Sequence, residues 1–110
     1  MEGGIRRGDI WTIQPPAHPK LRPALVISLN AINDLRPDIL VIPSTTVPGP
    51  TRVRLPNQPA QTGLREVSYA KGETLGPVPT TLFKKRIGAL PSDAWPPIKA
   101  RVLFLIGFDE

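Results

Sequence analysis

The chain has 110 residues, of which 14 are lysine or arginine and nine are aspartate or glutamate, so its formal net charge is +5. It has no cysteine and one histidine, which excludes a disulfide scaffold, a thiolate metal site, a cysteine nucleophile and any site built on two histidines of one chain. The length predicts a single domain over residues 1–110, and the excess of positive charge favours an anionic partner, nucleic acid first. Because no apolar signal segment is visible and the longest apolar cluster, 102–108, is too short to cross a bilayer, we expect a cytoplasmic protein without membrane contact.

Short apolar or alternating segments, bounded by proline and glycine, predict a series of β-strands. We expect strands at residues 10–13, 23–29, 39–42, 51–55, 64–70, 73–75 and at the end of the basic segment 84–90. Pro43 is expected to stop the third strand, and Val67 and Tyr69 are expected to point inward. Residues 30–34 predict a turn or a single helical turn, and the proline-rich stretches between strands, 56–63 among them, predict loops.

The pattern changes its period after residue 91. Two consecutive prolines, Pro96 and Pro97, fit only the first turn of a helix, where their missing N–H groups are not needed. A helix over residues 97–106 would carry apolar side chains on both sides, which is uncommon for a surface helix. We therefore expect it to pack on the sheet and to contact a partner chain, most simply in a homodimer. The predicted fold class is mainly β with helical additions, as a strongly bent sheet or a small barrel.

Several sequence motifs for nucleotide and metal chemistry are missing. The chain has no G-x-x-x-x-G-K-[ST] phosphate loop and no G-x-G-x-x-G dinucleotide motif. No tight pair of carboxylates is present to hold Mg²⁺. A metal-dependent nuclease or a nucleoside triphosphatase is not favoured, and we expect neither a metal nor a cofactor.

Arg22 is the first candidate for phosphate chemistry, because it lies between a proline-rich loop and an apolar strand that hold its backbone. Its guanidinium could present a planar fork of donors to a phosphate, or it could be a solvated charge at the strand edge. His18, four residues earlier, could move a proton near neutral pH, or it could simply face solvent. The basic run at residues 84–86 is only a weak charge signal.

Hydroxyl and arginine side chains farther along the chain carry the same kind of ambiguity. Thr45 follows the third strand at the mouth of a loop, and its hydroxyl could donate to a phosphate oxygen or bond to its own backbone in a turn. Ser44 and Thr46 have the same two interpretations. Arg52 and Arg54 share one face of a predicted strand, where they could bind phosphates or keep an exposed strand solvated.

A family resemblance rests on the order of these features. The string Gly8-Asp9-Ile10-Trp11, followed by Arg-Pro-Ala-Leu-Val-Ile-Ser at residues 22–28, resembles the MazF/PemK family of toxin endoribonucleases. Val-Ile-Pro-Ser-Thr-Thr at residues 41–46 is similar to the strand of that family that ends in V-P-x-T. The resemblance continues through Ile-Gly-Ala-Leu at residues 87–90 to the C-terminal helix, and is specific in residues 8–46.

The resemblance implies the toxin of a type II toxin–antitoxin system, with an SH3-like barrel, a C-terminal helix and a homodimer. It implies metal-independent, sequence-specific cleavage of single-stranded RNA, and a cognate antitoxin whose acidic tail covers the RNA groove. On that pattern Arg22 and Thr45 take the places of the catalytic arginine and threonine. The residues expected to contact RNA beside them are Ser44, Thr46, Arg52 and Arg54.

The stretch at residues 63–69 departs from the family pattern. Ser68 stands where the PemK branch has an aspartate, and Glu66 falls near the position of its arginine. The proton acceptor for attack by an RNA 2′-hydroxyl therefore stays open among His18, Glu66 and Ser68. Two alternatives use the same fold: a non-catalytic toxin resembling the gyrase poisons of the CcdB type, and an SH3-like module that binds RNA without cutting it.

Overall fold

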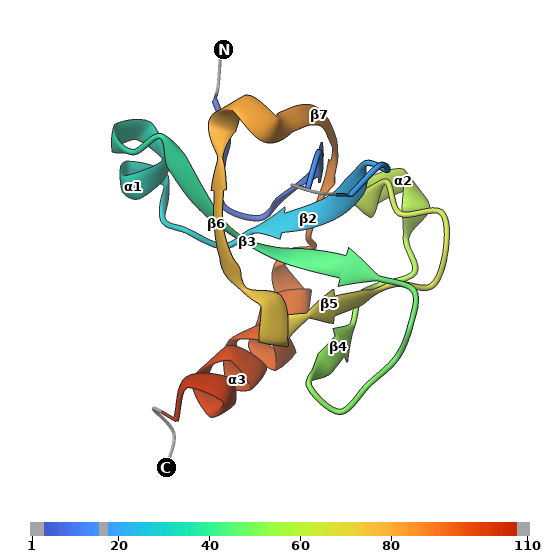
Figure 1. Cartoon of the computed structure of the whole chain (residues 1–110). Helices are drawn as coiled ribbons and strands as arrows, with labels where there is room; N and C mark the ends of the chain where they lie inside the picture. The colour runs from blue at the N-terminus through green and yellow to red at the C-terminus, as the bar shows by residue number, and fades with distance from the viewer. Residues whose placement is uncertain (1–3, 16–17, 108–110) are drawn as a thin grey trace.

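A computed structural model describes residues 4–15 and 18–107 (Figure 1). The strands are β1 (Asp9–Ile13), β2 (Arg22–Val26), β3 (Asp38–Thr45), β4 (Arg52–Arg54), β5 (Tyr69–Lys71), β6 (Gly76–Pro79) and β7 (Phe83–Ala89). The helices are α1 (Asn30–Leu35), α2 (Pro59–Thr62) and α3 (Trp95–Ile106), with short 3₁₀ turns at Gly72–Thr74, Thr80–Leu82 and Ser92–Ala94. The predicted class, mainly β with a C-terminal helix, is confirmed.

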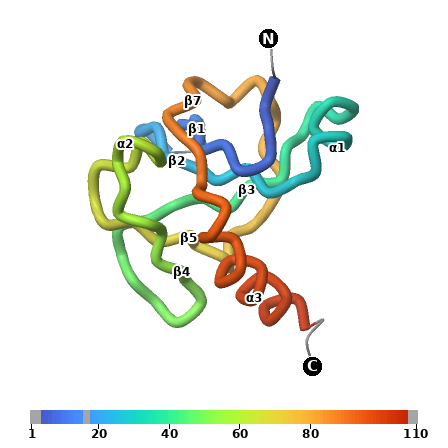
Figure 2. The backbone as a smooth tube through the Cα atoms, turned by 180° about the vertical axis from the view of Figure 1, so that it is seen from behind, coloured from blue at the N-terminus to red at the C-terminus, as the bar shows by residue number. Residues whose placement is uncertain are grey.

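All strands belong to one antiparallel, strongly bent sheet. Its order is β4-β5-β3-β2-β1-β7, and β6 pairs with β3 beside that path. The sheet is open: in the part of the chain that the structure describes, β4 and β7 are its two ends and do not pair with each other. The expectation of a barrel is therefore wrong in this respect, although the bending brings the two ends round toward each other, as Figure 2 shows from behind.

The α2 segment packs against β7 near one end of the open sheet. Gly63 ends α2 in the left-handed region (φ 74°), and a β-carbon there would collide with the backbone of Ile87. A β-carbon at Gly88 would collide with the backbone of Thr62. Because both segments lack a side chain at this crossing, the two backbones can approach each other directly. This contact, rather than a ladder of strand hydrogen bonds, joins β7 to the α2 segment.

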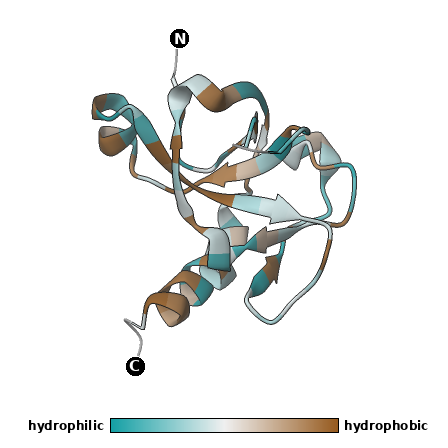
Figure 3. Cartoon of the chain, viewed as in Figure 1, coloured by the Kyte–Doolittle hydropathy of each residue, from teal (hydrophilic) through white to brown (hydrophobic). Residues whose placement is uncertain are grey.

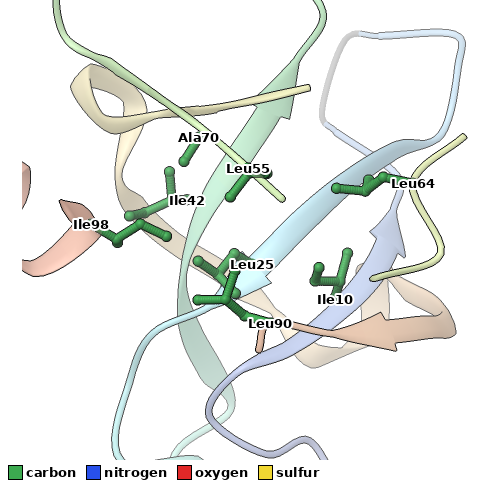
Figure 4. Close-up of a cluster of buried hydrophobic side chains, with 8 residues drawn as sticks. All are labelled: Ile10, Leu25, Ile42, Leu55, Leu64, Ala70, Leu90 and Ile98. Atoms are coloured by element: carbon green, nitrogen blue, oxygen red, sulfur yellow. The ribbon is translucent and has the colours of Figure 1, made fainter. Parts of the chain in front are cut away.

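Alternation along the central strands produces a separate core on each face of the sheet. One core lies between the sheet and α3 and is shown in Figure 4: Ile10, Leu25, Ile42, Leu55, Leu64, Ala70, Leu90 and Ile98. Ile98 is the α3 residue in this core and is 2% exposed, so its burial contributes about 2 kcal/mol. The second core, on the other face, includes Trp11, whose ring meets that of Phe83 edge-on at 5.7 Å.

The third strand continues through Pro43, so the prediction that this proline ends it is wrong. Pro43 pairs with Ala24 of β2 on one side. On the other side β6 pairs with residues 38–41 and β5 pairs with residues 44–45. Pro43 therefore lies where one partner strand gives way to the next, and its missing N–H interrupts neither ladder.

Residues 56–79 differ most from the sequence-based expectations. The predicted loop 56–63 contains α2, and β5 begins only at Tyr69, so Val67 is 41% exposed instead of pointing inward. The strand expected at residues 73–75 is a 3₁₀ turn, and the next segment, β6, was not predicted. The basic run at residues 84–86 lies within β7 instead of leading into a strand.

The C-terminal helix is confirmed, and it begins two residues earlier than expected, at Trp95. Ile98 packs inward, whereas Phe104 is 55% exposed in the C-terminal part of the helix, where the ribbon in Figure 3 has the colour of hydrophobic residues. Among the described helices, none has the length and apolar character that a membrane crossing requires.

Candidate active site

An open groove of about 660 Å³ begins where the apolar core of the sheet ends. Two residues beyond the core positions of β1, β2 and β3, the same face of the sheet carries Thr12, Pro23 and Ser44. Thr12 pairs with Pro23, and the Ser44 hydroxyl donates a hydrogen bond of 3.2 Å to the Pro23 carbonyl. The three strands continue, but the large apolar side chains of the core give way to the smaller Thr12, Pro23 and Ser44, two of them polar, and this change opens the groove.

The walls of the groove come from the α2 segment, the loop after it and β7. Pro59, Gly63 and Leu64 line one part of the groove. Ile87 of β7, whose backbone lies against Gly63, lines another part. Five charged side chains line the groove, four basic and one acidic: Arg22, Arg65, Lys85, Arg86 and Glu66. This balance favours an anionic chain as the ligand.

Arg22 and Thr45 line this same groove from adjacent strands. Ala24 pairs with Pro43 where β2 and β3 run side by side, and the same register carried two residues further sets Arg22 opposite Thr45. Arg22 is the first residue of β2 and is exposed, while Thr45 is the last residue of β3 and is half-buried. The two residues that the sequence singled out from separate segments therefore belong to one site.

The hydroxyl of Thr45 is held by the loop that follows it. The backbone N–H of Val47 donates a hydrogen bond of 3.2 Å to Thr45 Oγ1. This contact is the turn expected as the alternative to phosphate binding, but it engages the oxygen only as an acceptor. A hydroxyl that accepts one bond keeps its own proton to donate, so both functions are compatible. Ser44 and Thr46 flank Thr45 and also line the groove.

His18 lies beside Arg22 rather than on the lining of the groove. An Arg22 Nη2 nitrogen is 3.0 Å from His18 Nε2, and the backbone N–H of Lys20 is 3.2 Å from Nδ1. Both ring nitrogens thus face N–H donors, although a neutral imidazole has only one acceptor nitrogen. Only one of these contacts is a hydrogen bond at a time, so the tautomer of His18 is coupled to the position of the Arg22 guanidinium.

Of the other two candidates for the proton acceptor, Glu66 is the better placed. Both Glu66 and Ser68 line the groove. Ser68 is buried, and its hydroxyl donates a bond of 2.9 Å to the Glu66 carbonyl, so its proton is already engaged. Glu66 is exposed, which leaves its carboxylate open to a ligand. Among the described residues, no group of three His, Asp or Glu side chains is arranged to hold a metal ion.

Three basic residues of the groove were missed or underrated from the sequence: Arg65, Lys85 and Arg86. Lys85 pairs with Thr12 of β1, which brings the basic run of β7 to the groove. The Nε of Arg86 donates a hydrogen bond of 3.0 Å to the buried Asp9, which also accepts from the indole of Trp11. The basic run itself was visible in the sequence, but its position at the groove depends on the pairing of β7 with β1.

Arg52 and Arg54 do not line the groove. Arg52 forms an ion pair with Glu73, its Nη2 lying 3.0 Å from Oε2, and its Nη1 donates to the Val47 carbonyl at 2.8 Å. The hydroxyl of Thr51 donates to the other carboxylate oxygen of Glu73 at 2.7 Å. That hydroxyl above all, with the backbone N–H of Glu73 and the nearby Arg52, holds the pKa of the Glu73 carboxyl at about 2. Arg52 thus joins the loop after Thr45 to the turn before β6.

The sequence and the fold both match known toxins. The profile of the PemK-like, MazF-like toxins of type II toxin–antitoxin systems matches residues 6–106. The Mycobacterium tuberculosis toxin MazF-mt6 superposes with a TM-score of 0.77 at 23% identity, over 90% of this chain and 96% of that one. MazF from Deinococcus radiodurans superposes with a TM-score of 0.76 at 20% identity, over 94% and 97%.

A mycobacterial endoribonuclease solved in complex with its cognate antitoxin has a TM-score of 0.77 at 18% identity, over 94% of each chain. No curated protein sequence matches the chain. The open bent sheet with its C-terminal helix is thus the fold of MazF toxins. The chain belongs to the PemK/MazF family of toxins of type II toxin–antitoxin systems.

Proposed function

We propose that this toxin is a metal-independent endoribonuclease that cuts single-stranded RNA at specific short sequences in the groove lined by Arg22 and Thr45. The observation that carries the proposal is the juxtaposition of a guanidinium and a hydroxyl on adjacent strands of a basic groove. Family membership supports the same activity. An extended single strand suits the site, since the groove is open and its charges are spread along it.

The reaction uses the nucleophile that RNA itself carries. The 2′-oxygen of one nucleotide attacks the adjoining phosphorus, the bond from phosphorus to the 5′-oxygen of the next nucleotide breaks, and a 2′,3′-cyclic phosphate remains. One proton leaves the 2′-hydroxyl and one is delivered to the departing 5′-oxygen. The protein has to align these atoms, neutralise charge on the phosphorane and move both protons.

Arg22 and Thr45 supply the charge stabilisation. A guanidinium stays protonated at neutral pH, so Arg22 serves as a donor of two hydrogen bonds to the non-bridging oxygens and not as a base. Thr45 adds a donor from the neighbouring strand. Removing one such preorganised donor lowers the rate by about 10²–10³-fold.

Proton transfer falls to Glu66 or His18. The carboxylate of Glu66 is exposed on the groove, and His18 contacts the guanidinium that holds the phosphate. Ser68 is the least suited of the three candidates because its proton is bound to the Glu66 carbonyl. Ser44 and Thr46 act as RNA contacts beside Thr45.

Two partners complete the proposal. The first is a cognate antitoxin, of the kind that the mycobacterial endoribonuclease binds, whose acidic segment occupies the basic groove in place of RNA. The second is another copy of this chain, for which the exposed apolar side of α3, with Phe104 and Ile106, supplies a contact surface.

Incubation of the purified protein with single-stranded RNA in excess EDTA tests the activity. We expect discrete cleavage products from the wild type and a loss of about 10²–10³-fold in rate for Arg22→Ala and for Thr45→Ala. Intact RNA retained in a complex would instead indicate the RNA-binding module. Intact RNA with no complex would favour the non-catalytic toxin, and cleavage abolished by EDTA would contradict the metal-free mechanism.

A further inference from the structure

A chain of hydrogen bonds runs from outside the groove to the hydroxyl of Thr45. Its first member is the carboxylate of Glu73, which accepts bonds from Nε and Nη2 of Arg52 at 3.2 and 3.0 Å. The remaining nitrogen of the same guanidinium, Nη1, donates to the carbonyl of Val47 at 2.8 Å. The N–H of Val47 then donates to Thr45 Oγ1 at 3.2 Å. Four residues from two separate segments are thus joined into one network.

We infer that Arg52 is a positioning residue that orients the Thr45 hydroxyl through Val47, and is not a phosphate contact. The inference rests on the proposed function of Thr45. Arg52 makes all of its side-chain contacts to protein groups and only 18% of its side chain is exposed. Two of its guanidinium nitrogens, Nε and Nη2, donate to Glu73 Oε2 while the third, Nη1, donates to the Val47 carbonyl, a geometry that a lysine cannot reproduce.

The loop between β3 and β4 has few other contacts that could hold Val47 in place. Thr45 is the last residue of β3, so the strand ladder fixes its backbone on one side only. Residues 46–51 form a loop with two prolines and a glycine, and a hydrogen bond of 3.1 Å from the Arg52 N–H to the Gly49 carbonyl closes a tight turn at its end. Val47 in the middle of this loop is exposed and lacks a place in a core. Its backbone position therefore depends on the Arg52 side chain, and Glu73 fixes that side chain in turn.

The expected kinetic effect separates this role from a role in binding. Displacing a reacting group by about 1 Å lowers a rate by up to about 10²-fold, so Arg52→Ala is expected to lower kcat by about 10- to 100-fold with KM nearly unchanged. A phosphate contact would instead raise KM and reduce the salt dependence of RNA binding by about one charge. Arg36→Ala is the matched control, because it removes an equal charge from an exposed position outside the groove.

A double-mutant cycle tests whether Arg52 acts through Thr45. Under single-turnover conditions, we expect Arg52→Ala to have less than about a twofold effect when Thr45 is already alanine, since the hydroxyl it orients is gone. An equal loss in both backgrounds, or a rise in KM alone, would overturn the inference. If Arg52→Ala fails to fold, Arg52→Lys and Glu73→Gln carry the same prediction.

A second readout does not depend on cleavage. Arg52→Ala should shift the amide resonance of Val47 in a ¹⁵N spectrum and speed its hydrogen exchange, whereas Arg36→Ala should leave both unchanged. An unaltered Val47 amide in the Arg52 variant refutes the structural step directly. A wild-type protein that leaves RNA intact refutes the proposed function, and the amide measurement still reports on the network.

Discussion

The contact between the α2 segment and β7 makes a sharp prediction about stability. In Gly88→Ala the new β-carbon would lie 2.5 Å from the carbonyl oxygen of Gln61 and still closer to the carbonyl group of Thr62. Real β-carbons are essentially never found within 3.0 Å of such an atom, and the Thr62 carbonyl would lie at 2.3 Å, so one backbone has to move by at least about 0.7 Å. The neighbouring atoms are main chain, and no flexible side chain can turn aside to make room.

Overpacking of this kind destabilises a fold by about 1–3 kcal/mol. In a domain of this size that loss lowers the melting temperature by about 5–15 °C. Because the same two segments form a wall of the groove, cleavage should also slow. Gly76→Ala is the control, since its β-carbon would find its nearest neighbour, the carbonyl oxygen of Thr74, at 3.8 Å. Thermal unfolding followed by circular dichroism measures both variants, and equal melting temperatures for Gly88→Ala and Gly76→Ala would refute the close-approach argument.

Three other predictions concern the groove and the carboxylate of Glu73. Arg22→Lys keeps the charge but loses the planar fork, so kcat should fall by about 10²–10³-fold in a fluorogenic RNA assay; a fall below threefold would contradict the assigned role. Lys85→Ala in an inactive Thr45→Ala background should weaken RNA binding at every sequence and lower the salt slope by about one, as measured by fluorescence anisotropy; an unchanged slope would place Lys85 away from phosphates. The folded-state pKa of Glu73 is about 2 against an ordinary value of 4.5, lowered chiefly by the Thr51 hydroxyl. Its contribution to stability is therefore complete above about pH 4.5 and is lost as the pH falls through about 2. The stability gap between wild type and Glu73→Gln in denaturant unfolding should narrow between pH 5 and pH 2.5, and a constant gap would argue against the depressed pKa.

Local sequence rules predicted the elements whose residues carry their own signals. Short apolar runs located β1 and β3, alternation located β4, and the two prolines located the start of α3 to within two residues. The α2 helix could also have been found, since Pro59 at its first turn and Gly63 at its end are the usual start and stop residues.

Other elements depend on partners that the local sequence does not reveal. Pro43 stays within a strand because β6 ends and β5 begins beside it, and both arrive from residues far along the chain. The open sheet was not predictable either, since the crossing of Gly63 and Gly88 is a tertiary contact. Where a short segment has only a weak sequence pattern, its pairing with distant strands decides its structure.

The candidate site likewise contains residues that the sequence indicates and residues whose contacts it does not reveal. Arg22 and Thr45 were singled out because they stand next to recognisable strands and match the family pattern, and the register of those strands sets them side by side, while their catalytic roles stay predictions. Arg52 was expected either to bind phosphates or to keep an exposed strand solvated, because its strand alternates, whereas its partner Glu73 is 21 positions away in sequence. A long-range ion pair of this kind leaves no periodic signal.

Attack by the RNA 2′-hydroxyl can be tested with a single substrate change. The wild-type protein is incubated with two RNA oligonucleotides that differ only by a 2′-deoxy sugar at the nucleotide 5′ to the cut. The masses of the products are then measured by mass spectrometry. We expect the all-ribose strand to be cut to a fragment ending in a 2′,3′-cyclic phosphate and the deoxy strand to stay whole. Cleavage of both strands at the same rate would show that another nucleophile attacks the phosphorus.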